Sequence, residues 1–372
     1  MAAPSGKDMT SWPELEPMKN KLVNYGVTEN GIAIIELCSD SAGEPLVEGK
    51  TPVNTYTREM WHDIDDAILS ARFDDDVSVI LITGYGEKFF SAGASIKYLN
   101  KLTPRYKYFF CLHANETLSR LEQTPKLVIA ALNGHTVGGG LEIAMAADIR
   151  VARKGNFQVG LPEVALGVLA GTGGTARLSR LVGKAKAMEI MVTGRKFSFE
   201  ESREMDLVHD IYDSMTLEEF HQDVLDYAGR FTLPFAAAKA IGNIKRSVQS
   251  GLEIPLEYHL ALERELQSDL FQSNDAKEGI KAYVETKTPR FEGNSPSAGI
   301  LFKQPTGSPF KIIIRLSPNL TSGKKGWIII GSLSLSKNSE MIALASSSFF
   351  TKIIPSPPFP YKGLTTISLC TP

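Results

Sequence analysis

Hydrophobic and polar positions alternate with two distinct periods between residues 22 and 292, and the pattern predicts an α/β unit. Residues 77–83 (Val-Ser-Val-Ile-Leu-Ile-Thr) form a nearly continuous β-type run, which is typical of a strand covered on both faces. Residues 58–71 instead repeat apolar side chains with a helical period. The other expected strands are 27–37 with a turn at Asn30-Gly31, 127–132, 148–152 and 207–212, and the other expected helices are 104–123, 139–147, 217–230, 235–248, 257–271 and 275–285.

The order of these elements predicts the domain organisation. Strands alternate with helices up to about residue 170, whereas the pattern from residue 171 onward is mostly helical. We therefore expect an α/β fold class, with an N-terminal extension (1–20), an α/β core (21–215) and a helical C-terminal subdomain (216–292). The composition, 43% hydrophobic and 22% charged, is that of an ordinary globular protein.

The last 80 residues, 293–372, differ sharply from the rest. They hold eight Lys or Arg and one acid, Glu340, whereas the first 292 residues carry 32 basic and 41 acidic side chains. The net charge of −2 is thus the sum of −9 on residues 1–292 and +7 on residues 293–372. A net charge this close to zero argues against a general nucleic-acid binder. The tail is also rich in Ser and Pro, which predicts a poorly packed or disordered appendage, or an unnatural extension of the coding sequence. A partner-binding or membrane-surface arm is the alternative.

Cysteine usage and the N-terminus bear on location. Cys38, Cys111 and Cys370 form no CxxC pair and have no His at zinc-ligand spacing, so we expect a reducing compartment and no metal site. Residues 1–8 lack the features of a secretory signal or a transit peptide. No run approaches the about 18 apolar residues of a membrane span. The sequence therefore predicts a cytoplasmic protein.

Two glycine-rich loops follow predicted strands, at residues 89–97 and at residues 138–142. Glycine lets backbone N–H groups approach a ligand closely, and the first N–H groups of a helix have no partner within it. Two such donors aimed at one carbonyl oxygen would form an oxyanion hole. Each loop taken alone is more often a simple tight turn.

Two glutamates lie where helices are expected to begin. Glu142 follows three glycines and precedes a small, apolar helix, and Glu163 follows Pro162 in a Gly-Leu-Pro-Glu sequence. A glutamate in the first helical turn is normally a solvated partner of the helix dipole. Apolar surroundings would instead raise its pKa and suit it to acid–base chemistry. Spacing alone does not decide between these two interpretations.

A further glycine-rich stretch, residues 171–176 (Gly-Thr-Gly-Gly-Thr-Ala), fits a dinucleotide-binding pattern. More helix follows it, and not a strand that ends in an acid, so we do not expect a nicotinamide site.

Five ordered segments resemble the crotonase (enoyl-CoA hydratase/isomerase) family over roughly residues 22–292. They are residues 90–97, 133–142, 160–167, 171–178 and 278–285. The resemblance implies the ClpP/crotonase fold, a spiral core of repeated ββα units with a helical C-terminal subdomain. It also implies an enzyme of acyl-CoA and fatty-acid metabolism that assembles as a homotrimer or homohexamer.

The resemblance further implies roles for individual residues. The amides of Ala94 and Gly139 would hold the thioester oxygen, while Glu142 and Glu163 would face each other across the substrate Cα–Cβ bond. Members that add water in syn fashion to a trans-2-enoyl-CoA, giving 3-hydroxyacyl-CoA, have Glu at both positions. They need no cofactor, since coenzyme A is part of the substrate. Residues implied to contact the substrate or coenzyme A are Ala92, Ser95, Ile96, Lys97, Gly138 and Leu161, together with Tyr283 and Lys287 from the same or a neighbouring subunit.

Alternatives on the same scaffold are an enoyl-CoA isomerase, which often keeps only the carboxylate matching Glu163, an acyl-CoA hydrolase or lyase, and a non-catalytic CoA-binding homologue. His135 is expected to be a loop or packing residue. The chain departs from the usual family pattern in three places, which bear on the substrate more than on the chemistry. Ser95 stands where Asp is common, Ala170 replaces a common Pro, and residues 38–53 are longer than usual. Serine is also a good helix N-cap, so the helix after Ser95 should still form.

Overall fold

The computed structural model describes residues 10–293, 300–302, 311–315 and 327–332. The chain divides into two units, residues 1–294 and 295–372. In the second unit, strands β13 (Ile300–Phe302), β14 (Lys311–Arg315) and β15 (Trp327–Ser332) form an antiparallel sheet in that order. The predicted disorder of the remaining tail, and Cys370, lie outside the described residues.

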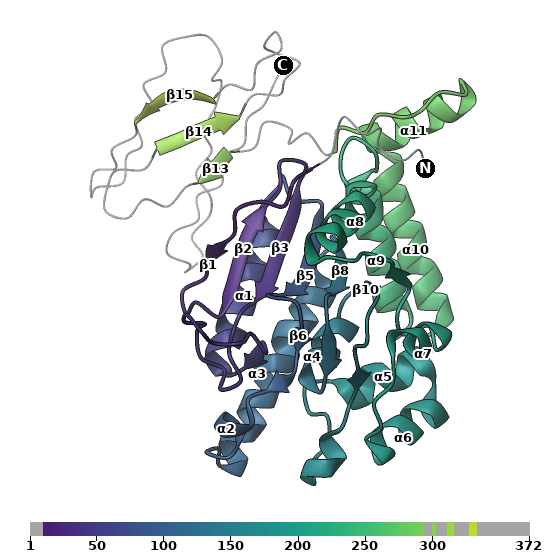
Figure 1. Ribbon diagram of the computed structural model, residues 1–372. Helices are drawn as coiled ribbons and strands as arrows, with labels where there is room; N and C mark the ends of the chain where they lie inside the picture. The colour runs from purple at the N-terminus through teal and green to yellow at the C-terminus, as the bar shows by residue number, and fades with distance from the viewer. Residues whose placement is uncertain (1–9, 294–299, 303–310, 316–326, 333–372) are drawn as a thin grey trace, which may run out of the picture. The chain divides into compact units, whose positions relative to one another are not determined.

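The first unit is built on a seven-stranded sheet with the order β1-β2-β3-β5-β8-β10-β12 (Figure 1). The strands from β3 to β12 run parallel, and β1 and β2 extend the sheet antiparallel at one edge. Their bounds are β1 (Glu16–Pro17), β2 (Val23–Val27), β3 (Ile32–Leu37), β5 (Val79–Gly84), β8 (Leu127–Leu132), β10 (Ile149–Arg153) and β12 (Asp210–Tyr212). All the strands expected from the sequence are in this sheet.

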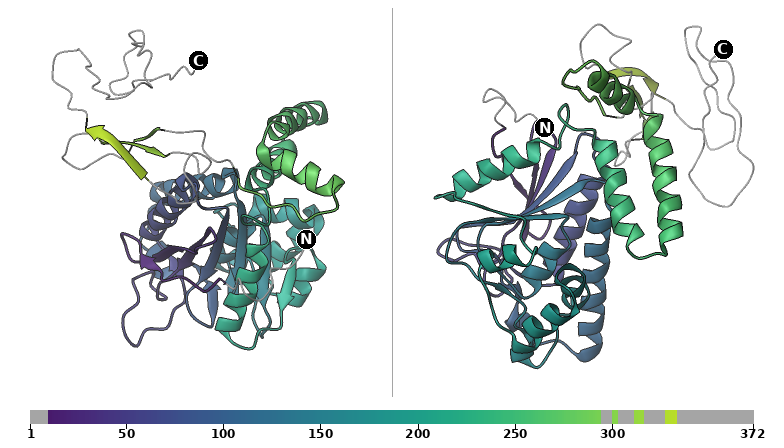
Figure 2. Two further views of the ribbon diagram at one scale, coloured as in Figure 1. Left: turned by 90° about the horizontal axis from the view of Figure 1, so that it is seen from above. Right: turned by 90° about the vertical axis from the view of Figure 1, so that its right-hand side faces the viewer.

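Both faces of the large sheet are covered, as the run at residues 77–83 predicts. Ile34 and Leu81 pack with helix α8 (Leu217–Gly229) in one hydrophobic cluster. Ile35 and Ile80 belong to a second cluster with helices α1 (Arg58–Phe73) and α3 (Pro104–Gln123). The period-2 alternation of strand side chains explains this division, and Figure 2 shows the sheet between the two helical layers.

Short strands that the sequence pattern missed build the part of the fold beside the glycine loops. Strands β6 (Phe89–Ser91), β9 (His135–Val137) and β11 (Val159–Gly160) form a second parallel sheet. Strand β4 (Thr55–Tyr56) pairs with β7 (Gly93–Ala94). Strands of two or three residues are too short to display an alternation. Since β5, β8 and β10 are each followed by one of these strands and then by a helix, the chain shows the expected ββα repeats.

The helices occur close to their expected positions. The mostly helical region after residue 171 begins with three short helices at 174–182, 184–193 and 199–204, and Gly183 and Gly194, with positive φ angles of 82° and 61°, lie between them. Residues 10–20, expected as an extension, contribute β1 and pack Trp12 and Leu15 on the sheet. None of the helices in the described part is long and apolar enough to cross a membrane. The other helices are α2 (Ile96–Leu99), α4 (Gly139–Met145), η1 (Glu163–Leu166), α5 (Gly174–Val182), α6 (Lys184–Thr193), α7 (Phe199–Glu204), α9 (Ala238–Gly251), α10 (Leu256–Phe271) and α11 (Asn274–Val284).

Candidate active site

The two glycine-rich loops meet where β7 passes the start of α4. Gly93 has a φ of +85°, and a Cβ atom on it would lie 2.6 Å from the backbone nitrogen of Gly139. Only glycine allows so close an approach. The fold thereby brings Ala94, the residue after Gly93, and Gly139 next to each other, as an oxyanion hole requires.

Gly139 is the first residue of α4, so its N–H has no acceptor within the helix. A Cβ atom at this position would lie 1.9 Å from the hydroxyl oxygen of Tyr56, which excludes any side chain. The preceding Gly138, with φ of +59°, donates its N–H to the carbonyl of Gly160 at 2.8 Å. That bond ties the loop before α4 to the strand that leads to Glu163.

Glu142 is not a solvated helix-start residue, because only 2% of it is exposed. Its Oε1 accepts hydrogen bonds from the backbone N–H groups of Thr172 and Gly174, each at 2.7 Å. Burial raises the pKa of Glu142, and these amides act in the opposite direction by stabilising its charge. The carboxyl is thus desolvated but held in a fixed orientation.

Glu163 opens the short helix η1 and is half-buried. Its Oε1 lies 3.2 Å from the position that a Cβ atom on Gly138 would occupy. Its Oε2 is buried and has no hydrogen-bond partner within the described part of the chain. Burial raises the pKa of Glu163 to about 7, and the charge of Glu142 contributes to the rise. Near neutral pH this carboxyl can therefore hold or release a proton.

The charge of Glu142 acts on the pKa of Glu163, and one lysine acts on the pKa of both. The charge of Lys107, on α3, lowers the pKa of Glu142 and of Glu163. Two nearby carboxyls with raised pKa values favour a state in which one is protonated while the other is ionised. Such a pair can act as general acid and general base at the same time.

An apolar cavity of about 360 Å³ opens beside Glu163. Besides Glu163 it is lined by Leu161, Val164, Val168, Leu169, Ala170, Thr175, Ser179, Lys184, Ala187, Met188, Met191 and Val192, from η1, α5, α6 and the segments between them. Leu161, predicted as a substrate contact, thus lines the same apolar space as Glu163.

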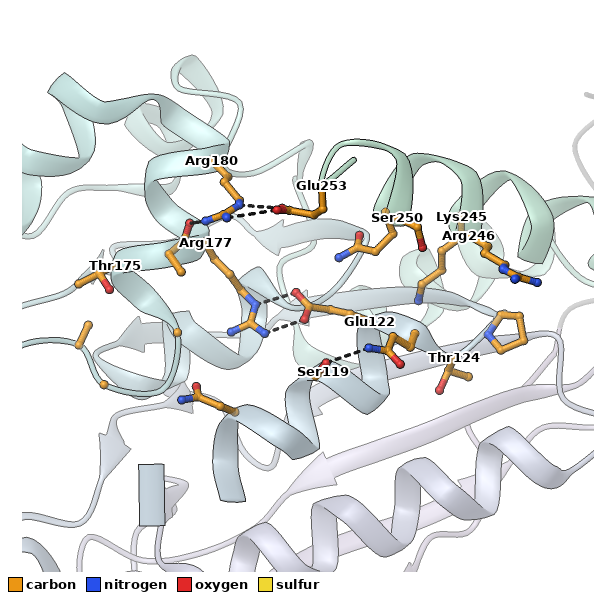
Figure 3. Close-up of a pocket in the computed structure, with 18 of the residues that line it drawn as sticks. Ser119, Glu122, Thr124, Thr175, Arg177, Arg180, Lys245, Arg246, Ser250 and Glu253 are labelled. Carbon is orange, nitrogen blue, oxygen red and sulfur yellow. Dashed lines mark hydrogen bonds and ion pairs between the residues drawn. The ribbon is translucent and has the colours of Figure 1, made fainter. Parts of the chain in front are cut away.

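A larger cavity of about 880 Å³ lies between α3, α5 and α9 and contains neither glutamate (Figure 3). Three of its cationic residues form ion pairs: Arg177 with Glu122 at 2.7 Å, Arg180 with Glu253 at 2.9 Å, and Lys245 with Asp148 at 2.9 Å. It reaches the loop at residues 170–173, and its two carboxyls, Glu122 and Glu253, are both held in ion pairs with arginines. The smaller space beside Glu163 is therefore the better candidate for a reacting substrate.

The predicted contacts near the first loop have different environments. Ser95 is buried and caps α2, where its Oγ accepts from the N–H of Tyr98 at 3.3 Å, so the expected helix start is confirmed. Ile96 is 56% exposed and Lys97 is exposed as well, so both are accessible to a ligand. Ala92 is half-buried, and its N–H donates to the carbonyl of Val53 at 3.1 Å.

Tyr283 and Lys287 are not brought to the glutamates within one chain. Tyr283 is 87% exposed on α11, and Lys287 pairs with Glu285 at 2.7 Å. Figure 1 shows α11 at the end of the first unit opposite α2 and α6. Their contact with coenzyme A of a neighbouring subunit stays a prediction. His135 packs against Phe89 and Phe157, as a packing histidine should.

Four residues of the site did not emerge from the sequence as functional. Thr172 and Gly174 fell within a glycine-rich stretch and a family-like segment but were given no role, although their amides hold Glu142. Tyr56 and Lys107 lie in segments without a motif. Tyr56 lies between a long loop and a helix, and Lys107 is one lysine on an amphipathic helix, so the sequence alone does not indicate a functional role for either.

The ββα repeats define a crotonase-type α/β fold, and this fold carries a pair of desolvated carboxyls at the meeting point of its glycine loops. A family model described as "Enoyl-CoA hydratase/isomerase" matches residues 46–294. The chain therefore belongs to the enoyl-CoA hydratase/isomerase family, a family of acyl-CoA enzymes.

Similar proteins agree with this assignment. The mitochondrial enoyl-CoA hydratase of Pongo abelii is 34% identical over 266 residues, which cover 71% of this chain and 84% of that protein. The short-chain-enoyl-CoA hydratase of Clostridium acetobutylicum is 32% identical, over 64% of this chain and 93% of its own length. The crystal structure of an enoyl-CoA hydratase from Geobacillus kaustophilus HTA426 matches with a TM-score of 0.67 and 38% identity. It covers 75% of this chain and 99% of its own, so a quarter of this chain has no counterpart in it.

Proposed function

We propose that this protein is an enoyl-CoA hydratase, which adds water in syn fashion across the double bond of a trans-2-enoyl-CoA to give a 3-hydroxyacyl-CoA. The observation that carries the proposal is the pair of desolvated glutamates, Glu142 and Glu163, beside the meeting point of the Ala94 and Gly139 loops. Relatives with hydratase names, at 31–35% identity, support the same reaction class.

In this mechanism the thioester oxygen accepts hydrogen bonds from the backbone amides of Ala94 and Gly139. When the oxygen of the attacking water bonds to Cβ, negative charge develops on the thioester oxygen and an enolate forms. Fixed amide donors stabilise such a charge strongly because they need no reorientation during the reaction. Burial around the loops increases the effect by excluding water.

The environments of the two carboxyls suggest how they divide the proton transfers. Two amide hydrogen bonds on Oε1 favour the ionised form of Glu142, which suits it to accept a proton from the attacking water. The buried, unpartnered Oε2 and the pKa of about 7 favour a protonated Glu163, which suits it to give a proton to Cα. The hydroxyl then resides on Cβ, the new hydrogen on Cα, and the proton held by the pair has moved from Glu163 to Glu142.

The rest of the proposal concerns binding and assembly. Ala92, Ser95, Ile96, Lys97 and Gly138 would contact the coenzyme A thioester, and Leu161 the acyl chain. The acid, the base and the charge-stabilising donors all come from the chain, so no further cofactor is required. A homotrimer or homohexamer would allow Tyr283 and Lys287 to reach the coenzyme A of a neighbouring subunit, and the cytoplasm is the proposed location.

A direct test is the hydration of crotonyl-CoA and of a longer trans-2-enoyl-CoA, followed by loss of the conjugated thioester absorbance. We expect Glu142→Gln and Glu163→Gln each to lower kcat by about 10²–10⁴-fold, since each removes a general acid or base. Glu257→Gln, which changes an exposed glutamate on α10, is the matched control and should leave kcat unchanged. Full activity in both active-site variants would refute the mechanism.

The same variants separate hydration from isomerisation. With a trans-3-enoyl-CoA as substrate, an isomerase that relies on one carboxylate would lose activity in Glu163→Gln and keep it in Glu142→Gln. Turnover of that substrate without hydration of crotonyl-CoA would replace the proposed hydratase by an isomerase.

A further inference from the structure

We propose that Tyr56 and Thr172 are positioning residues whose two buried hydroxyls form a hydrogen-bonded chain that holds the Glu142 carboxyl in place for proton transfer. The proposal rests on the proposed function for its kinetic consequences. Its structural content, a tyrosine hydroxyl acting on a glutamate through a threonine, stands on hydrogen bonds among three residues that are each 2% exposed.

The contacts run from strand β4 to helix α4 through the loop that precedes α5. The hydroxyl oxygen of Tyr56 lies 3.2 Å from Oγ1 of Thr172, across 116 residues of sequence. Thr172 in turn donates its backbone N–H to Oε1 of Glu142 at 2.7 Å, and its side chain also lowers the pKa of that carboxyl. Thr172 therefore contacts both the tyrosine and the catalytic carboxyl.

The number of available protons determines which hydroxyl donates in each hydrogen bond between Tyr56, Thr172 and Glu142. A threonine hydroxyl has one proton to donate, so if it serves the Glu142 carboxylate, the bond between Tyr56 and Thr172 must be donated by the tyrosine. Tyr56 is able to do so because burial, with the charge of Glu142, raises its pKa well above the ordinary value, and the hydroxyl keeps its proton. Hydrogen bonds in such a chain strengthen one another.

Packing leaves the Tyr56 hydroxyl little freedom to turn away. The ring makes an edge contact with Trp61 at a centroid distance of 5.0 Å and a tilted contact with Phe110 at 6.0 Å. Its hydroxyl fills the space in which a side chain on Gly139 would lie. Tyr56 therefore touches the proposed oxyanion hole directly and reaches the proposed base through one threonine.

The loop that carries Thr172 is also held from its other side. Nη1 of Arg177 donates to the carbonyl of Thr172 at 3.2 Å, and the same guanidinium forms two hydrogen bonds of 2.7 Å with Glu122. The pair connects α5 to α3 across the larger cavity, as Figure 3 shows. Thr172 is thus fixed at its carbonyl, while its N–H donates to Glu142 and its hydroxyl contacts Tyr56.

Other titratable groups face the same region and contribute to the pKa values of Tyr56, Glu142 and Glu163. Glu163 on η1 and Lys107 on α3 act on the glutamate pair, and Cys111 on α3 acts on Tyr56. The variants described next change none of these groups, so a pH shift that they cause reports on the hydroxyl chain.

The test compares Tyr56→Phe and Thr172→Val, each of which removes one hydroxyl and keeps most of the shape. We expect kcat for crotonyl-CoA to fall about 10-fold in each, the effect of one buried hydrogen bond, with KM changed less than about 2-fold. The acid limb of the kcat–pH profile should move to higher pH, because Glu142 loses stabilisation of its charge. Thr172→Ser, which restores the hydroxyl, should return both values towards wild type. Tyr25→Phe, which removes a half-buried hydroxyl on β2, is the control.

A second measurement works without turnover. Infrared titration of ¹³C-glutamate-labelled protein, with the Glu142→Gln spectrum subtracted, follows the Glu142 carboxyl in the ligand-free protein. An upward shift of its titration in Tyr56→Phe and Thr172→Val supports the chain, and an unchanged titration in either overturns it. If wild-type protein fails to hydrate crotonyl-CoA, the proposed function fails, and the infrared result still decides about Tyr56 and Thr172. A rise in KM alone, with kcat and the pH limb unchanged, would reassign both residues to substrate binding.

Discussion

At the scale of single residues, burial separates Glu142 and Glu163 from other glutamates that begin helices. Glu218 and Glu219 occupy the first turn of α8 on the surface, where Glu219 completes a capping box with Thr216. Glu142 has the same place in its helix, but amides of a different loop hold its carboxyl in an apolar interior. A glutamate in the first turn is therefore a solvated cap in one helix and a buried, hydrogen-bonded carboxyl in the other.

The raised pKa of Glu163 predicts a pH-dependent cost in stability. Because its pKa rises from 4.5 to about 7 on folding, the folded state binds the proton more tightly, and stability falls as pH rises through this window. The full difference corresponds to about 3 kcal/mol, and screening at this half-buried site reduces it to about 1–2 kcal/mol. We expect Glu163→Gln to be more stable than wild type by that amount at pH 8 and close to it at pH 4.5.

Urea unfolding at the two pH values measures this difference. Glu257→Gln again serves as the control, because it removes an exposed carboxyl from α10. A stability difference for Glu163→Gln that is the same at pH 4.5 and pH 8 would show that the carboxyl titrates normally in the folded protein.

At the scale of elements, the position of the first glycine loop depends on Ser95 at the start of α2. Its Oγ accepts from the N–H of Tyr98 and donates to the carbonyl of Ala42 at 2.8 Å. One side chain thus caps the helix and fastens the long segment at residues 38–53. Aspartate, which the family often has here, could cap the helix but could not donate to Ala42.

Ser95→Ala should therefore lower the free energy of unfolding by about 1–3 kcal/mol through the lost cap and the unpaired carbonyl. It should also expose residues 41–52 to limited proteolysis, read by mass spectrometry. Ser95→Asp should restore the cap and leave the segment equally cleavable. Thr103→Ala, which removes only the cap of α3, should cost about 1 kcal/mol without new cleavage. If residues 41–52 stay resistant in Ser95→Asp, the bond to Ala42 does not hold them.

At the scale of the whole molecule, the first unit contains every proposed catalytic residue and both hydrophobic clusters. A chain that ends at Asn294 should accordingly keep its midpoint of thermal unfolding within a few degrees and its crotonyl-CoA activity within about 2-fold, since it retains both clusters. Differential scanning calorimetry and the hydratase assay measure both. A shortened chain that aggregates, or loses activity while folded, would assign residues 295–372 a part in the enzyme.

The sequence by itself determined the long elements, the α/β class and the positions of the glycine loops and glutamates, because these depend on periodicity over many residues or on residue types with special backbone behaviour. It could not give strands such as β7 or β11, which exist only through pairing with a distant segment. Only the tertiary structure decided that Gly93 meets Gly139 and that the amides of Thr172 and Gly174 hold Glu142. It also decided that the Tyr56 hydroxyl lies beside Gly139 and Thr172. Desolvation and hydrogen-bond geometry depend on groups that are far apart in the sequence and close together in the folded protein. The pattern of residues along the chain does not show which of these groups come together.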